Sequence, residues 1–165
     1  MLPNCKVTFT ASGAYLREQK GKKATMQMGA GGFKLPTMLP IRLGTRLFTG
    51  ELRNDGTVDA PVKLTIYGTG EMPTIVNHTT GAKVIVNQRI ETGARLEINT
   101  DPDALSCVLI GPDGEAADAF GYLDADTAIS AFVLIPGTND VEYVPSLPSQ
   151  ESRVEITWQS MYEGV

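Results

Sequence analysis

The stretch from Thr65 to Thr100 constrains the fold of this chain more than any other. It consists of short apolar runs rich in β-branched residues, separated by breaks of Gly, Pro and Asn. The runs end at Tyr67 or cover residues 74–77, 83–87 and 94–100. This spacing is typical of an antiparallel β-sandwich or barrel. Nothing in the stretch resembles a catalytic site, so pattern and composition alone predict an all-β domain without a function.

Other segments show the same strand patterns. Apolar and polar residues alternate over residues 62–67, 95–99 and 153–158, as expected for half-buried strands. Two continuously apolar runs, Cys107 to Gly111 and Ile129 to Gly137, predict strands deep in the sandwich. Helical periodicity is nearly absent, and residues 116–120 could form at most one turn of helix before Gly121. With roughly ten strands, the fold class is an antiparallel two-sheet β-sandwich of the jelly-roll type.

The first third of the chain is less regular. A strand is predicted at residues 6–10, a loop or edge segment at 16–23 and a short strand at 25–28. The glycine run at 29–32 predicts a flexible turn, because no Gly-Lys-Ser/Thr of a phosphate-binding loop follows it. Pro36 and Pro40 predict an irregular or edge segment, since proline cannot donate a hydrogen bond to a sheet. Pro36, Pro40 and the pair Lys22–Lys23 would protect the edge from pairing with other chains.

We expect one domain spanning residues 1–165, a length that can bury a sizeable core. Residues 1–48 would supply N-terminal strands and the proline-bearing edge segment, and residues 49–165 the sandwich core. Asn54 to Gly56 predicts a turn between strands. Gly81 and Gly137 each close a turn, where we expect a positive φ that other residues tolerate poorly.

The composition excludes several functional classes. Hydrophobic residues make up 42% of the chain and charged residues 20%, which is ordinary for a folded protein. The net charge of -5 disfavours nucleic-acid binding, and the basic run at residues 17–23 predicts a solvated loop. No run approaches the length of a membrane span, and the first residues lack a signal-peptide pattern. Cys5 and Cys107 are expected to be reduced thiols in a protein made in the cytoplasm.

We predict no catalytic, cofactor-binding or metal-ligating residues. His78 lies in an evident turn, with no second histidine or cysteine nearby for a metal and no serine or cysteine placed to use it as a base. Acidic pairs occur at 101 and 103, 113 and 115, and 124 and 126, but none has the ligand spacing of a calcium loop. No pattern points to the paired carboxylates of a glycoside hydrolase. Trp158 is in phase with Val154 and Ile156, which favours a core position over a sugar-stacking platform.

Several motifs follow one another in a specific order. They are KVTFTASGAYL, FKLPTMLPI, LRNDGTVDAPVKLTIYG, EMPTIVNHTTG, GARLEINTDP, YLDADTAISAFVLIPGTNDVEY and ITWQSMYEGV. This succession resembles the C-terminal domain of siphovirus distal tail proteins, components of the phage tail tip. That family has an Asn-x-Gly turn, then Asn-Pro-x-Ile-x-Asn-x-x-Thr-Gly, Gly-x-x-Leu-x-Ile-Asp-Thr and Leu-x-Pro-Gly-x-Asn. The chain departs mildly, with Glu71-Met72-Pro73 in place of Asn-Pro and Asn99 in place of Asp.

The resemblance implies a galectin-like β-sandwich without enzymatic activity, located in the virion tail and made in the cytoplasm of the bacterial host. Its partners would be the tail tube, the hub and the receptor-binding parts of the tail tip or baseplate. Glycan binding varies in the family, and the chain has no galectin-type His-x-Asn-x-Arg pattern, so no sugar site is transferred. The family's N-terminal ring-forming domain is missing from this sequence, so we expect ring closure to lie elsewhere and the isolated chain to be a monomer or weak oligomer.

Two other functions remain open at this point. The first is a carbohydrate-binding module that contacts the bacterial surface. The second is an accessory domain of a larger prophage protein encoded by the host.

Overall fold

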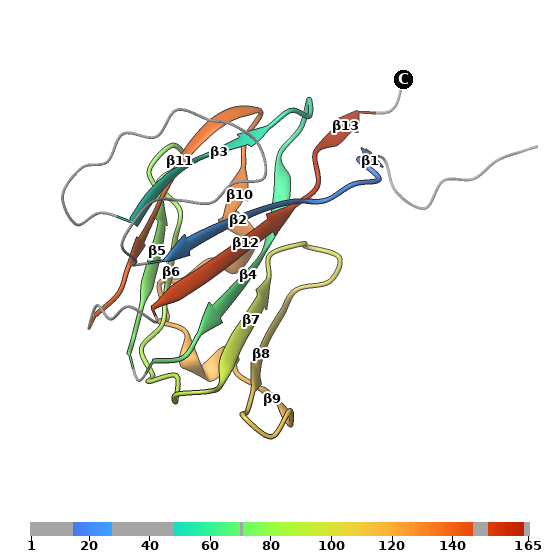
Figure 1. The fold of residues 1–165 in the computed structure, drawn as a ribbon. Coiled ribbons are helices and arrows are strands. Elements are labelled where there is room, and N and C mark those ends of the chain that lie inside the picture. Colours follow the sequence, from blue (N-terminus) through green and yellow to red (C-terminus); the bar gives the residue numbers. More distant parts are fainter. Residues whose placement is uncertain (1–14, 28–47, 70, 147–151, 164–165) are drawn as a thin grey trace, which may run out of the picture.

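A computed structural model describes residues 15–27, 48–69, 71–146 and 152–163 (Figure 1). The described part is an all-β sandwich in which every strand pair is antiparallel. The predicted fold class is therefore confirmed. Within these residues there is no helix long and apolar enough to cross a bilayer.

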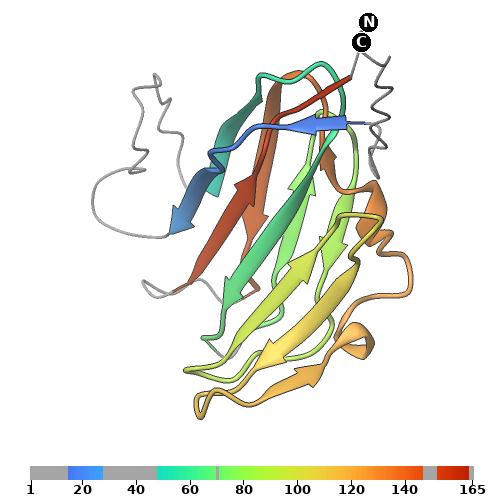
Figure 2. The same ribbon diagram turned by 90° about the vertical axis from the view of Figure 1, so that its right-hand side faces the viewer.

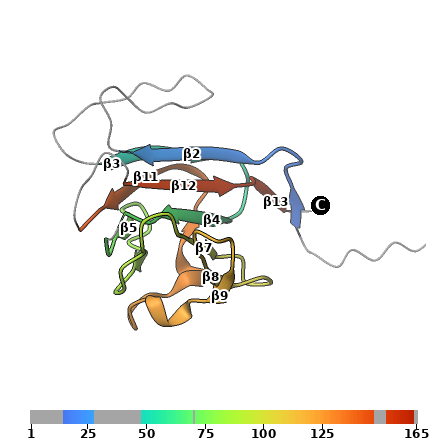
Figure 3. The same ribbon diagram turned by 60° about the horizontal axis from the view of Figure 1, so that its bottom comes forward.

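The larger sheet has seven strands and follows the order β2-β12-β4-β7-β8-β9, with β10 pairing with one end of β4. In Figure 2 these strands run obliquely, side by side. In Figure 3 they follow one another from β2 at the top to β9 at the bottom. Their bounds are β2 (Lys22–Gln27), β12 (Arg153–Trp158), β4 (Ala60–Tyr67), β7 (Arg95–Asn99), β8 (Ser106–Ile110), β9 (Ala116–Asp118) and β10 (Val133–Leu134).

The smaller sheet has four strands in the order β3-β11-β5-β6. A separate two-stranded ribbon pairs β1 with β13, and two short 3-10 helices complete the described elements. The bounds are β3 (Phe48–Asn54), β11 (Gly137–Val144), β5 (Thr74–Asn77), β6 (Lys83–Ile85), β1 (Tyr15–Arg17), β13 (Met161–Glu163), η1 (Phe120–Tyr122) and η2 (Ile129–Ala131).

The core lies between the two sheets and is built by period-two alternation. In β4 the side chains of Val62, Leu64 and Ile66 are buried, while those between them face away. The smaller sheet contributes Leu52, Ile75, Val84, Val141 and Tyr143 to the same cluster. A fully buried aliphatic side chain contributes about 1.5–3 kcal/mol. The alternation predicted for β4, β7 and β12 is thus confirmed, and it determines which face of the larger sheet is left for other contacts.

Two predicted elements differ from the structure. The run from Ile129 to Gly137 is not one deep strand: it forms η2, the two residues of β10 and then a crossing to β11 in the other sheet. Pro136 has no N–H to donate, so the chain leaves the first sheet there. Residues 116–118 form strand β9 instead of a helical turn, because they pair with β8, and the 3-10 helix begins only at Phe120.

Smaller differences from the predictions occur at β8 and at the N-terminal strands β1 and β2. The strand at Cys107 exists, but only Cys107 is fully buried in it, because β8 lies next to the exposed edge strand β9. The predicted loop or edge segment at residues 16–23 contains the end of β1 and the start of β2. The predictions for residues 6–10 and 29–32, and for Cys5, Pro36 and Pro40, lie outside the described residues.

The crossing from β10 to β11 is held by three buried asparagines on three neighbouring strands. Asn54 donates to the carbonyl oxygens of Val58 and Leu134, at 2.8 and 2.9 Å. Asn77 donates to the carbonyl oxygen of Val133 at 2.9 Å. Since β10 pairs with the larger sheet, these bonds join the two sheets at one end.

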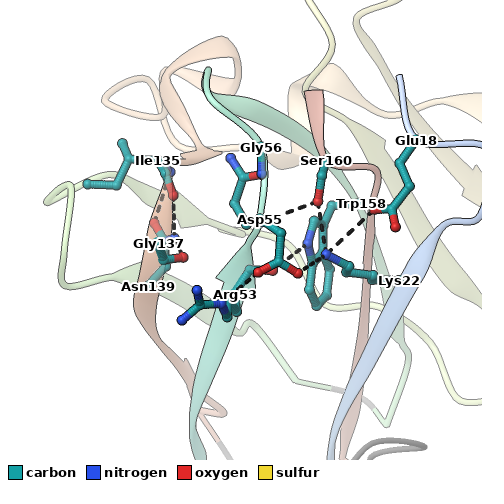
Figure 4. A network of polar contacts seen from close by, with 11 residues as sticks. Glu18, Lys22, Arg53, Asp55, Gly56, Ile135, Gly137, Asn139, Trp158 and Ser160 are labelled. Atoms are coloured by element: carbon teal, nitrogen blue, oxygen red, sulfur yellow. Dashed lines mark hydrogen bonds and ion pairs between the residues drawn. The ribbon is translucent and has the colours of Figure 1, made fainter. Parts of the chain in front are cut away.

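Asn139 makes the closest contacts with the crossing itself (Figure 4). Its side-chain oxygen accepts from the Ile135 N–H at 3.0 Å, and its amide donates to the carbonyl oxygens of Ile135 and Gly137 at 2.8 and 3.3 Å. Gly137 has a φ of 96° and Gly81, in the turn after β5, a φ of 77°. The positive φ predicted at both glycines is confirmed.

Candidate interaction surface

The outer face of the larger sheet carries mostly polar side chains, in rows that the strand register defines. Cross-strand pairing aligns Lys23, Thr157, Lys63, Asn99 and Ser106 in one row. The next two rows run in parallel. They contain Thr25, Glu155, Thr65, Glu97, Val108 and Asp118, and then Gln27, Arg153, Tyr67, Arg95, Ile110 and Ala116. We call these three rows the outer face.

Most charges of the outer face are paired with one another. Lys23 Nζ lies 2.8 Å from Glu155 Oε2, and Arg95 Nε lies 2.7 Å from Glu97 Oε1. The Tyr67 hydroxyl donates to Glu155 at 3.0 Å. Burial of Glu155 opposes its ionisation, but the hydrogen bonds from Lys23 and Tyr67 and nearby positive charge outweigh this and lower its pKa.

Arg153 is held differently. Its guanidinium carbon lies 3.7 Å from the centre of the Tyr67 ring, a cation–π arrangement. Its Nε is buried and has no hydrogen-bond partner. The stack therefore holds the Arg153 guanidinium over the Tyr67 ring, in the same row of the outer face.

Lys63, by contrast, makes no hydrogen bond or ion pair with the described residues, and its side chain borders a hollow of about 240 Å³. The hollow exists because short side chains stand between longer ones on the sheet. Its lining includes Thr65, Thr157, Ser106 and Val108, together with Glu97 and Asn99. We call it the Lys63 hollow. Its hydroxyl groups and ammonium group can donate hydrogen bonds to an acceptor that enters from outside.

A second hollow of about 280 Å³ adjoins the first and shares Lys63, Asn99 and Thr157 with it. Arg17 of β1 closes one side by an ion pair with Asp101, 2.7 Å between Nη2 and Oδ2. Burial of Asp101 raises its pKa, but the hydrogen bonds from Arg17 and from the Asp103 backbone outweigh that effect, so the pKa is lowered.

Trp158 reaches this second hollow from the core side and is only 7% exposed. Its indole N–H donates to the carbonyl oxygen of Arg53, 3.2 Å away in the smaller sheet (Figure 4). The predicted burial of Trp158 is confirmed. A ring buried in this way, with its N–H occupied, offers no face for sugar stacking.

A polar network surrounds Trp158 and joins the sheets at this end (Figure 4). Lys22 Nζ lies 2.6 Å from Asp55 Oδ2 and 2.9 Å from the Ser160 hydroxyl oxygen. Partial burial lowers the pKa of Lys22, but Asp55 and Glu18 outweigh this and raise it. Hydrogen bonds from Lys22 and Arg53 lower the pKa of Asp55. The Lys22 side chain therefore serves a structural contact in addition to any protection of the sheet edge.

Comparison with known proteins identifies the family. Residues 55–162, more than half of the chain, match the model of the siphovirus-type tail component, C-terminal domain. The chain belongs to this family. No curated protein and no solved structure matches it.

Family membership makes the chain a component of siphovirus-type tails and gives it a place in the virion tail. The matched region contains the turn motifs with Asn77 and Asn139, two of the asparagines that hold the β10–β11 crossing. The motifs KVTFTASGAYL and FKLPTMLPI precede residue 55 and lie outside the match.

His78 lies in the turn after β5, where its Nε2 is 2.6 Å from Glu142 Oε2. Glu142 comes from β11, so this contact ties the turn to the smaller sheet. Across the described ranges, no three His, Cys, Asp or Glu side chains are arranged to hold a metal ion.

The acidic pairs of the tail component have a structural role that the sequence analysis missed. In each pair the first carboxylate accepts the backbone N–H two residues on: Asp101 from Asp103, Asp113 from Glu115, and Asp124 from Asp126. These are Asx turns, in which a side chain replaces a backbone acceptor. The signal that could have revealed them was the first aspartate of each pair in a turn-forming stretch, because the residue two positions on contributes only its backbone N–H.

The Cys107 thiol and the Glu71–Tyr143 pair are buried in the core. The Cys107 thiol is buried and free, its Sγ donates to the Ala119 carbonyl oxygen at 3.2 Å, and burial raises its pKa to about 11. Glu71, noted from sequence only as a departure from Asn-Pro, is 1% exposed and accepts a hydrogen bond from the Tyr143 hydroxyl. Burial and Glu71 raise the pKa of Tyr143. Neither group belongs to the three rows of the outer face.

Proposed function

We propose that this chain is a non-enzymatic structural domain of the tail tip or baseplate, joining the tail tube, the hub and the host-recognition parts. The observation that carries the proposal is the family match over residues 55–162. The surface agrees with it. The outer face combines ion pairs with a shallow polar hollow, which suits contacts between proteins better than a reaction.

In this proposal residues 1–165 form a single galectin-like domain with no catalytic, cofactor-binding or metal-ligating residues. In this proposal the isolated protein is a monomer or a weak oligomer. Light scattering on the purified protein checks this last point. A stable hexamer in dilute solution would contradict it, although it would agree with a place in the tail.

The location in the tail tests the main proposal. An epitope tag inserted at the exposed turn at Thr80 and Gly81, between β5 and β6 of the smaller sheet, has room there and should leave the core intact. Gold-labelled antibody on purified virions should mark the distal end of the tail. Labelling along the whole tail tube, on the capsid, or on no virion would refute the proposal. The untagged phage is the control for antibody specificity.

A carbohydrate-binding module that contacts the bacterial surface is the second candidate. The Lys63 hollow favours it, since hydroxyl, amide and ammonium groups line a concave site. Binding of the protein to isolated host cell walls, lost when Thr157→Arg fills the hollow and kept in Thr138→Ala on the other sheet, would support this candidate. Equal binding by both variants would exclude the hollow as a glycan site.

A further inference from the structure

Lys63 forms no ion pair with an acidic side chain in the described part of the chain, although Asp101 is near enough to interact with its charge. Glu97 forms its ion pair with Arg95, and Asp101 forms its ion pair with Arg17. Neither carboxylate therefore contacts Lys63 directly. The hydroxyls of Thr65, Thr157 and Ser106 line the same hollow. An ammonium group and hydroxyl donors around a small concavity match a carboxylate, which accepts several hydrogen bonds at once.

The β8–β9 hairpin offers such a carboxylate. Residues 111–118 include Asp113, Glu115 and Asp118 and no basic residue, and all three acids are exposed. Figure 2 shows this hairpin at the lower end of the molecule, at the margin of the larger sheet. The Asp113 carboxylate is engaged in its own turn, whereas the exposed Glu115 side chain makes no hydrogen bond or ion pair with the described residues.

We propose that the β8–β9 hairpin of one copy docks on the Lys63 hollow of a second copy, with the Glu115 carboxylate bound by Lys63. This inference rests on the proposed function and names one of its contacts. Charge complementarity carries it: cations outnumber acids on the outer face, where Lys23, Lys63, Arg95 and Arg153 stand against Glu97, Glu155 and Asp118. The chain as a whole has a net charge of -5.

The residues that line the Lys63 hollow include no aromatic ring, which disfavours a saccharide that would stack on one. An exposed charge pair is weak alone, and association steered by charge falls as salt rises. Several copies held in one tail would compensate by avidity. The proposed contact therefore predicts weak, salt-sensitive self-association of the free protein.

Sedimentation velocity on the full chain tests the proposal by exchanging the two charges. The wild-type protein should associate at about 0.05 M salt and dissociate at about 0.5 M. Lys63→Glu alone and Glu115→Lys alone should each weaken association by about fivefold or more, because each places like charges together. An equimolar mixture of the two variants should associate again. Asp126→Lys, the same charge change in another exposed turn, is the matched control and should behave as wild type.

Circular dichroism confirms that each variant is folded. A wild-type protein that stays monomeric at low salt, or a mixture that fails to recover association, would overturn the inference. Binding of cell-wall saccharide that Lys63→Glu abolishes, without self-association, would overturn it in favour of the glycan. Gold labelling of virions that carry Lys63→Glu distinguishes the failure of this contact from the failure of the proposed function. If the label lies at the tail tip and the free protein does not self-associate, only the contact between copies is refuted.

Discussion

Replacing Asn139 by alanine removes the side chain that holds the β10–β11 crossing. Asn139 is fully buried on β11, and its amide meets both the N–H and the carbonyl oxygen of Ile135 as well as the carbonyl oxygen of Gly137. Alanine can replace none of these contacts. The variant therefore leaves backbone groups of Ile135 without protein partners at a half-buried crossing.

The expected loss follows from those groups. A buried backbone group without a partner costs about 1–3 kcal/mol, and the Ile135 N–H and carbonyl each lose one. Ile135 is half-buried, so water can partly replace the lost bonds. We expect Asn139→Ala to lower the free energy of unfolding by about 2–4 kcal/mol, a large share of the roughly 5–15 kcal/mol of a typical domain. Asn139→Asp should lose at least as much, because it places a carboxylate oxygen against the Ile135 carbonyl.

Urea unfolding measures this loss. Trp158 is the only tryptophan in the chain, so its emission reports the transition, with circular dichroism as a second probe. Thr138→Ala is the control: Thr138 precedes Asn139 on the same strand but is exposed, and it should change stability by less than about 0.5 kcal/mol. If Asn139→Ala matches Thr138→Ala, the asparagine network does not hold the crossing.

Three further outcomes are expected. Trp158→Ala should cost about 3–5 kcal/mol in urea unfolding followed by circular dichroism, since the variant has no tryptophan; a loss below about 1 kcal/mol would place the ring outside the core. Gly81→Val and Gly137→Val should each destabilise by clearly more than about 0.5 kcal/mol, since valine rarely adopts their positive φ; smaller losses at both sites would contradict this. Stability should hold above about pH 5 and fall as the pH drops below about 4. The carboxylates of Asp55, Asp101 and Glu155 have lowered pKa values when folded, so they stabilise the protein until they are protonated; acid titration at constant ionic strength would refute this if stability rose instead.

The fold class was predictable because the strands carry a strong period-two signal. Val62, Leu64 and Ile66 alternate with polar residues, and the same pattern placed Trp158 in the core. The run from Ile129 to Gly137 shows where this reasoning fails. Continuous apolar character indicates burial, but it does not tell a strand from a buried crossing between sheets.

The interaction surface was largely hidden from the sequence. Lys63, Thr157 and Ser106 lie on three different strands and come together only through the register of β12, β4, β7 and β8. Register between strands distant in sequence depends on the whole fold. The Asx turns were hidden for the opposite reason: they are local, but paired acids were considered only as metal ligands.

The ribbon of β1 and β13 determines how the domain would respond to mechanical force. Tyr15 pairs with Glu163 and Arg17 with Met161, so the outer ends of the two strands lie at the same end of the ribbon. Tension applied at these two ends would break the hydrogen bonds between the strands one after another. It would not load all of them at the same time. Under such tension β1 should separate from β13 before the sandwich unfolds, with the Arg17–Asp101 ion pair as the last contact that holds it.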